Sequence, residues 1–415
     1  MFGHKKEKKT DRPLAAPGGD KLGVYIHIPF CKSKCDYCDF YSLAGREDQM
    51  DRYQKALLSH IAETAPMAQV PVDTIYFGGG TPSLYGEKRL KEILTALKKQ
   101  LPVDKDAEIT LEANPDSVDL RSLRRLRRAG FNRISLGMQS ADPAELEAVH
   151  RPHTVQQTDQ AVTMAKKAGF KNLSLDLIYG LPGQTEESWR ATVEHALSLI
   201  PQHLSCYGLK VEEGTPLAQR VEEGEVLPDD DAQADRYLWT VGRLARAGFA
   251  QYEISNFAKP GHESRHNLRY WLTRPYIGFG PGAHSDFGGR RYSFVRDLDA
   301  YIKGVLEGGN ILDSEELIPR QERCGEYLML RLRTAQGIDG VEYRRNYFMD
   351  FAPLEARLEQ FAAQGWVERS PEGRWHFTPK GFLVSNQIIG ELQELLNREK
   401  LERLRRAQEG DYRVV

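Results

Sequence analysis

The sequence is poor in cysteine, has no excess of one charge and has no long apolar run. Only five cysteines occur in 415 residues, and 57 Lys and Arg offset 59 Asp and Glu to a formal net charge of −2. So few cysteines do not form the disulfide framework of a small secreted protein. A balanced charge creates no global field for nucleic acid, and no stretch reaches the ~18 apolar residues of a membrane span. We therefore expect a soluble, cytoplasmic protein that binds no nucleic acid and has no transmembrane segment.

Composition predicts a short tail ahead of a large folded region. Residues 1–20 are rich in lysine, proline and glycine and contain few apolar side chains. Burial of so little apolar surface cannot offset the entropy of ordering, so we predict a disordered basic tail. The remaining chain is long enough for a barrel-sized domain of roughly 200 to 300 residues and a smaller one.

From Gly23 onward, short apolar segments alternate with segments of helical periodicity. GVYIHI, DTIYFGGG, EITLEAN, RISLGMQ and NLSLDLIYG are strand-like, whereas segments such as EKRLKEILTALKKQ repeat apolar residues at three and four positions. Repeated βα units with nearly continuous apolar strands predict an α/β fold with a parallel sheet, as a barrel or a doubly wound sheet. We favour a barrel over residues 21–257, because several units follow one another and the first lacks a dinucleotide fingerprint.

The pattern changes after Phe257. Residues 258–316 form a Gly/Pro-rich, aromatic stretch that contains HNLRYW, and we predict a connecting region there. Residues 317–415 return to helical periodicity and include two short strand-like pieces around a Pro-Glu-Gly turn. They predict a small C-terminal helical, winged-helix-like module, whose mixed charges favour packing on a neighbour over binding DNA.

Three cysteines are clustered directly after the first strand-like segment, as Cys31, Cys35 and Cys38 in CKSKCDYC. A structural zinc ion takes four protein ligands, and nearby His27 is a candidate for the fourth. A disulfide would leave one thiol over. A four-iron cluster takes one thiolate per iron, so three cysteines would leave one iron open to a substrate. The triplet favours an iron–sulfur cluster, with zinc as the alternative.

Further candidate residues lie where a barrel places its active site, at the carboxyl ends of strands or in the loops beyond them. The run GGGTP (78–82) is either a tight turn or a backbone that approaches a ligand closely, because glycine has no Cβ. Asp176 interrupts the apolar NLSLDLIYG, and a buried carboxylate is costly unless it is paired, so a functional role is favoured. Glu112 ends EITLEANP, while Gln139 and Arg151 taken alone would be surface polar residues.

The spacing C-x3-C-x2-C together with GGTP resembles the signature of the radical S-adenosylmethionine (SAM) superfamily. The resemblance implies a partial TIM-like βα barrel in which Cys31, Cys35 and Cys38 hold a [4Fe-4S] cluster, whose open iron chelates the amino and carboxylate groups of SAM. It also implies that the matching residues bind SAM, namely Gly79, Gly80, Thr81, Glu112, Gln139, Arg151 and Asp176, with Tyr25 and Tyr37 as lesser contacts. In that pattern Asp176 holds the ribose hydroxyls, and Arg151 forms a charge-assisted pair with a carboxylate.

Within the superfamily, the sequence is most similar to the oxygen-independent coproporphyrinogen III dehydrogenases and to heme chaperones of the HemW type. The dehydrogenases carry a further cysteine two residues beyond the third, where this sequence has Phe40, and the chaperones carry an HNxxYW motif, here HNLRYW. Both features favour the chaperone. The resemblance then implies heme binding and delivery to client hemoproteins, with membrane-associated respiratory enzymes as candidates. The alternative is oxidative decarboxylation in porphyrin metabolism, and whether the SAM site turns over stays open.

The HNLRYW segment also has an interpretation from its own chemistry. Imidazole is a common axial ligand of heme iron, and aromatic rings can cover a porphyrin face. We predict that His266 is an axial ligand, with His262 and His284 as rivals. The other interpretation is a loop whose Tyr270 and Trp271 pack on the barrel.

Overall fold

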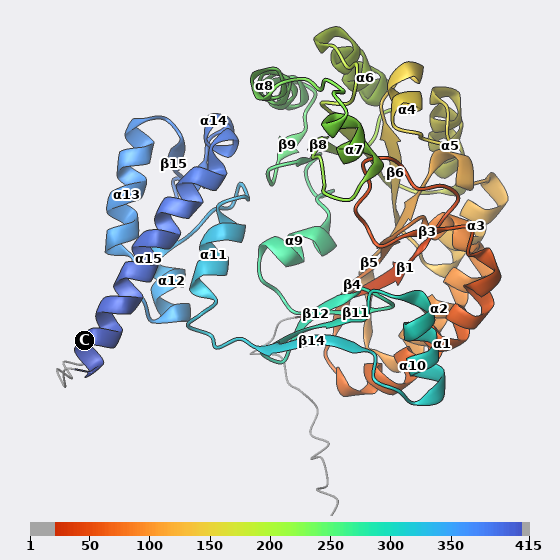
Figure 1. Cartoon of the computed structure of the whole chain (residues 1–415), viewed down its shortest axis with the longest axis horizontal. Coiled ribbons are helices and arrows are strands. Elements are labelled where there is room, and N and C mark those ends of the chain that lie inside the picture. The colour runs from red at the N-terminus through yellow and green to blue at the C-terminus, as the bar shows by residue number, and fades with distance from the viewer. Residues whose placement is uncertain (1–20, 409–415) are drawn as a thin grey trace, which may run out of the picture.

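A 12-stranded mixed sheet forms the larger part of the molecule (Figure 1). In this computed structural model, which describes residues 21–408, the strand order is β14-β13-β12-β11-β1-β4-β5-β6-β7-β8-β10-β9. The strands from β11 to β8 in this order are parallel, and antiparallel strands extend the sheet at either end. The two outer strands, β14 and β9, do not pair with each other, so the barrel is incomplete. The basic tail lies outside the described residues.

The strands of this sheet have the bounds β1 Leu22–Ile28, β4 Val72–Gly79, β5 Val103–Ala113, β6 Arg133–Gln139, β7 Asn172–Tyr179, β8 His203–Gly208, β9 Ala250–Gln251, β10 Asn256–Ala258, β11 Tyr276–Phe279, β12 His284–Phe287, β13 Arg290–Phe294 and β14 Leu312–Leu317. The helices of this part of the chain are α1 Met50–Thr64, α2 Glu87–Gln100, α3 Leu120–Ala129, α4 Pro143–Ala148, α5 Val155–Ala168, α6 Glu186–Ser198, α7 Pro216–Glu222, α8 Asp230–Arg246, α9 Arg265–Trp271 and α10 Leu298–Glu307. Short 3-10 turns cover Glu47–Gln49, Ala65–Met67, Pro82–Tyr85 and Pro115–Ser117. Two short strands, β2 Phe30–Cys31 and β3 Leu43–Ala44, pair with each other around the cysteine loop.

The two faces of the parallel sheet differ in chemistry, because successive side chains of a strand point to opposite faces. Ile26, Phe77 and Leu136 face outward and are fully buried in the large hydrophobic cluster between the sheet and its helices. The alternate positions face the barrel interior and are mostly polar, namely Thr74, Tyr76, Glu108, Thr110, Glu112, Arg133, Ser135, Ser174, Asp176, His203 and Ser205. The apolar core therefore lies outside the barrel, and its interior is left for polar groups.

The chain beyond Phe257 continues the sheet. β11 pairs in parallel with β1, with Tyr25 opposite Gly278, and β12, β13 and β14 follow as antiparallel strands. The region expected to connect two domains thus supplies four strands of its own. α9 precedes β11 and lies between the barrel strands and the C-terminal helices (Figure 1). It therefore packs at the amino-terminal ends of the parallel strands, opposite the cysteine loop.

The C-terminal helices and a β-hairpin enclose a second, smaller hydrophobic core. Leu328, Leu358 and Ile388 are among its buried residues. Its elements are α11 Cys324–Arg331, α12 Gly340–Tyr347, α13 Ala352–Ala363, β15 Val367–Arg369, β16 Trp375–Phe377, α14 Pro379–Leu383 and α15 Ser385–Gln408. β15 and β16 pair in antiparallel fashion around the Pro-Glu-Gly turn. None of the helices in residues 21–408 is long and apolar enough to cross a membrane.

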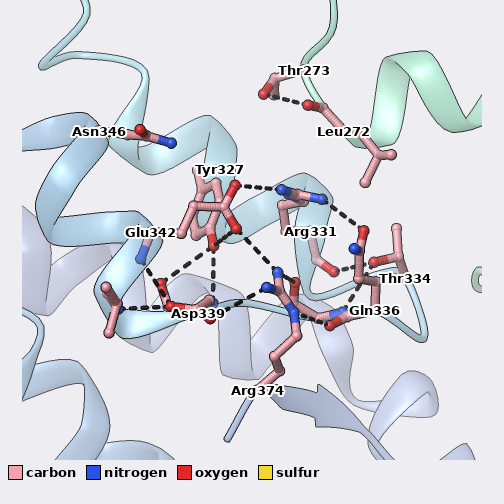
Figure 2. Close-up of polar contacts among 12 residues, drawn as sticks. Leu272, Thr273, Tyr327, Arg331, Thr334, Gln336, Asp339, Glu342, Asn346 and Arg374 are labelled. Atoms are coloured by element: carbon pink, nitrogen blue, oxygen red, sulfur yellow. Dashed lines mark hydrogen bonds and ion pairs between the residues drawn. The ribbon is translucent and has the colours of Figure 1, made fainter. Parts of the chain in front are cut away.

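An ion-pair network attaches the hairpin to the C-terminal helices (Figure 2). Arg331 donates to Glu342 Oε1 at 2.6 Å, and Arg374, which precedes β16, donates to Glu342 Oε2 at 3.1 Å and to Asp339 at 3.3 Å. Burial opposes ionisation of Glu342, but the two arginines outweigh it and lower the pKa of that carboxyl. The network joins α11, α12 and the hairpin into one unit.

Candidate cluster and cofactor site

The three clustered cysteines lie in the loop that follows β1. Cys31 ends β2, and the Cys38 N–H donates to the Cys35 carbonyl at 3.1 Å, which closes a turn. All three thiols are free; Cys35 is buried, and the other two are partly exposed. Burial raises the pKa of the Cys31 and Cys38 thiols, and the neighbouring cysteines raise it further. The thiols therefore lie close enough to influence one another's charge.

The donor set fits an iron–sulfur cluster better than a single zinc ion. In the described part of the chain, no three His, Cys, Asp or Glu side chains converge as ligands of one ion. His27, the candidate fourth zinc ligand, has Nδ1 bonded to the Tyr25 hydroxyl at 3.1 Å and Nε2 to the Tyr41 carbonyl at 2.8 Å. In a four-iron cluster each thiolate binds a different iron, so the sulfurs need not converge on one atom.

Polar side chains from neighbouring loops contact the thiols. Arg151 donates through Nη1 to Cys35 Sγ at 3.3 Å and through Nη2 to Asn114 Oδ1 at 3.0 Å. The Thr81 hydroxyl donates to Cys31 Sγ at 3.5 Å and accepts from Asn114 Nδ2 at 3.3 Å. Donors aimed at sulfur favour the thiolate, which is the form that binds iron. Within residues 21–408 the buried Arg151 Nε has no hydrogen-bond partner, so the guanidinium retains a donor for a carboxylate ligand.

The glycines at the end of β4 allow other residues to approach the backbone closely. Gly79 has φ +111°, and a Cβ there would lie 2.6 Å from His27 Cε1. A Cβ on Gly80 would lie 2.7 Å from the Phe30 carbonyl oxygen, and the Thr81 N–H donates to that carbonyl at 2.8 Å. The run is a turn packed on the cysteine loop, which places Thr81 beside the thiols.

Glu112 occupies the barrel interior next to Tyr76. The Tyr76 hydroxyl donates to Glu112 Oε1 at 2.5 Å. Burial raises the pKa of Glu112 to about 7; Asp176 adds to the rise, and the tyrosine hydrogen bond opposes it. This carboxyl is therefore poised to gain or lose its proton near neutral pH, and a cationic ligand would favour its charged form.

Asp176 is held by a set of serine hydroxyls. Ser205 donates to Asp176 Oδ1 at 2.6 Å, Ser135 donates to Oδ2 at 3.0 Å, and Ser174 donates to Oδ1 at 3.4 Å. Burial raises the pKa of Asp176, while these hydroxyls and the Arg133 guanidinium oppose the rise. The serines fix the orientation of the carboxylate and lower the cost of its burial.

The remaining predicted SAM contacts lie beside Arg151 or Tyr76. Gln139 ends β6 with φ +63°, a left-handed conformation that is uncommon for residues other than glycine and that clusters at functional sites. A Cβ on Gly137 would lie 2.9 Å from Gln139 Nε2 and 3.0 Å from Arg151 Nη2, so this glycine makes room for both side chains. Tyr37 interacts electrostatically with Arg151, and Tyr25 stacks on Tyr76 with ring centroids 6.3 Å apart.

His266 lies in α9, at the opposite end of the barrel from the cysteine loop. Its side chain is 0% exposed. Nδ1 is hydrogen-bonded to the Thr74 hydroxyl at 2.9 Å and Nε2 to the Tyr270 hydroxyl at 2.8 Å, so both ring nitrogens are engaged. His284, by contrast, is exposed in β12.

Comparison with known proteins identifies the family. The radical SAM superfamily matches residues 25–196. A protein of Mycobacterium tuberculosis called heme chaperone HemW is 39% identical over 388 residues, which cover 91% of this chain and 97% of that protein. The chain belongs to the HemW family of radical SAM proteins. The HemW of Escherichia coli is 36% identical over 371 residues, covering 89% of this chain and 97% of that protein.

A solved structure supports the same family assignment at the level of fold. The radical SAM coproporphyrinogen III oxidase of Escherichia coli matches with a TM-score of 0.81 and 26% identity, over 94% of this chain and 93% of that one. Together with the HemW relatives, this likeness confirms the predicted family and the predicted radical SAM fold with a C-terminal helical region. Membership of the radical SAM superfamily implies a [4Fe-4S] cluster and SAM, and the HemW relatives are named heme chaperones.

The sequence interpretation missed the residues that hold the predicted SAM contacts in place. Tyr76 and Asn114 contact Glu112 and Arg151 respectively. The serines around Asp176 occupy alternate positions on β6, β7 and β8. Polar residues at every second position of an otherwise apolar strand could have indicated these inward-facing positions in the sequence.

Proposed function

We propose that this protein is a heme chaperone that carries a SAM-binding [4Fe-4S] cluster and delivers heme to client hemoproteins. The observation that carries the proposal is the similarity to proteins named heme chaperone HemW over almost the full length of both chains. Membrane-associated respiratory enzymes remain candidate clients. A cytoplasmic location is part of the proposal, since all the cysteines are free thiols, as expected in a reducing compartment.

The proposed cluster ligands are Cys31, Cys35 and Cys38, and the polar groups around them suit SAM. Arg151 and Gln139 meet above Gly137, where the free guanidinium donor can pair with the carboxylate of SAM. Glu112 and Asp176 place two acidic groups in the barrel interior, and the serines keep Asp176 oriented to accept hydrogen bonds from hydroxyls. When bound, the cluster and SAM would supply one-electron chemistry, and these residues would bind and orient SAM.

The heme ligand stays a prediction. Ligation by His266 requires one ring nitrogen to give up its hydrogen bond to Thr74 or Tyr270, because both nitrogens are engaged in this conformation. His284 is the accessible rival.

The second candidate function is oxidative decarboxylation of coproporphyrinogen III, since the structural neighbour is a coproporphyrinogen III oxidase. The position two residues after Cys38 is Phe40, whose side chain is 70% exposed, where the dehydrogenases carry a further cysteine. One reconstituted anaerobic sample can test both functions by heme titration and by an assay for protoporphyrinogen with SAM and a reductant. A heme chaperone should bind heme and form no protoporphyrinogen. SAM-dependent formation of protoporphyrinogen without heme binding would favour the decarboxylation of coproporphyrinogen III instead.

A further inference from the structure

We infer that His266 is a positioning residue for the SAM site, because its ring supports Tyr76 and Tyr76 in turn fixes Glu112. The inference rests on the proposed function, in which Glu112 contacts SAM. It gives the HNLRYW helix a task at the amino-terminal end of the barrel that requires no heme.

Tyr76 connects the two ends of the barrel interior. Its ring stacks on His266 with centroids 5.1 Å apart and planes at 24°, while its hydroxyl donates to Glu112 at 2.5 Å. The next inward position on β4 is Gly78, and a Cβ there would lie 3.0 Å from both Tyr76 Cε1 and Glu112 Oε2. A side chain at that position would displace the hydrogen-bonded pair. Gly78 itself offers no side chain to support Tyr76, and the rings packed on the tyrosine are those of His266 and Tyr25.

His266 is held rigidly enough to act as a support. Its two nitrogens bond to the hydroxyls of Thr74, on β4, and Tyr270, one helical turn further along α9. Neutral imidazole offers one donor and one acceptor, so it can serve both hydroxyls at once. Burial lowers the pKa of His266 to about 3, which keeps the ring neutral at physiological pH.

The helix that carries His266 is itself anchored to the sheet. The backbone N–H groups of Arg265 and His266 donate to the Glu108 carboxylate at 3.2 and 3.1 Å. Arg269 forms an ion pair with Asp73 at the start of β4 and donates to the Lys21 carbonyl at 2.6 Å. α9 thus closes the amino-terminal end of the barrel and fixes the position of the imidazole beneath Tyr76.

The test is a double-mutant cycle on SAM affinity, measured by anaerobic calorimetry on the cluster-reconstituted full chain. Tyr76→Phe removes a hydrogen bond to a carboxylate and should weaken SAM binding about tenfold. His266→Ala removes the stacked ring and should weaken it roughly two- to tenfold. Because both act through the same hydroxyl, the double variant should bind SAM no more weakly than Tyr76→Phe. Fully additive losses, or wild-type affinity in His266→Ala, would overturn the inference.

A matched control and a conservative pair separate positioning from general stability. His60 is also buried, bonds to the Tyr301 hydroxyl at 2.8 Å and packs against aromatic rings, but lies on α1 away from Glu112. His60→Ala should leave SAM affinity unchanged even if it lowers the unfolding temperature. His266→Phe keeps a stacking ring without its hydrogen bonds and should weaken SAM binding less than His266→Gln, which keeps hydrogen bonding without the ring. Weaker SAM binding by His266→Phe than by His266→Gln would overturn the inference. This comparison does not depend on the His266→Ala protein, so it still applies if that variant does not fold.

The wild-type measurement distinguishes this inference from the proposed function. A reconstituted wild-type protein that holds iron but binds no SAM removes the SAM site from the proposal, and the inference with it. If the wild type binds SAM but the affinity losses of the two single variants add up in the double variant, only the role of His266 is removed.

Discussion

Replacing Glu112 with Gln should change how SAM affinity depends on pH. Burial, with Asp176 nearby, raises the pKa of Glu112 to about 7. Such a carboxyl is about one-tenth ionised at pH 6 and about nine-tenths ionised at pH 8. If the carboxylate is the form that binds, wild-type affinity should rise about tenfold between these pH values from this group alone. The Glu112→Gln protein lacks this titration but keeps that of SAM and of every other group at the site, so it serves as the reference.

The same pKa predicts the opposite effect on stability. A carboxyl with a raised folded-state pKa binds its proton more tightly in the folded protein than in the unfolded chain. The free energy of unfolding therefore falls as pH rises from about 4.5 towards 7. The shift from 4.5 to about 7 corresponds to at most about 3 kcal/mol, and to less because the side chain is only partly buried by area. The Glu112→Gln apo-protein should therefore unfold at a higher temperature than wild type at pH 8, with a smaller difference at pH 5.

Both arms use the same two proteins. SAM affinity is measured anaerobically after reconstitution, and unfolding is followed by circular dichroism without cluster or SAM. Parallel SAM-affinity profiles for wild type and Glu112→Gln would refute the assignment of Glu112 to SAM. A Glu112→Gln protein that is less stable than wild type at pH 8 would refute the claim that the ionised Glu112 carboxylate destabilises the folded apo-protein.

Two further predictions concern the heme ligand and the serine support. Comparison of Soret bands in heme-loaded proteins tests the ligand: a changed band in His266→Ala supports His266, whereas identical bands for wild type and His266→Ala exclude it, and a change only in His284→Ala moves the ligand to β12. Ser205→Ala removes the 2.6 Å hydrogen bond to Asp176 and should weaken SAM binding about fivefold at pH 7. Unchanged affinity would show that this serine does not orient the carboxylate.

The parts of the fold that follow from local sequence patterns could be predicted. The βα alternation indicated a parallel sheet because each strand and helix carries its own periodicity. The cysteine spacing indicated the cluster because its three thiols lie on one short loop. The continuation of the sheet past Phe257 was not predicted, because the pairing of β11 with β1 is a contact between distant segments.

The barrel interior was the part that sequence patterns left unresolved. The segment DTIYFGG looks nearly continuous in its apolar character, yet Thr74 and Tyr76 point inward while Ile75 and Phe77 join the core. The motif around His266 indicated heme chemistry, but its location depends on how α9 docks on β4 and β5. Tertiary contacts of this kind have no local signature in the sequence.

The iron content of the Cys35→Ser protein tests the central assignment most directly. Three thiolates leave no spare ligand for a four-iron cluster, so loss of one should abolish stable iron binding after anaerobic reconstitution. Cys206 is a matched control, since it is a free, buried thiol in β8. The account predicts iron and sulfide at background in Cys35→Ser and at the wild-type level in Cys206→Ser. Full iron occupancy in Cys35→Ser would contradict it.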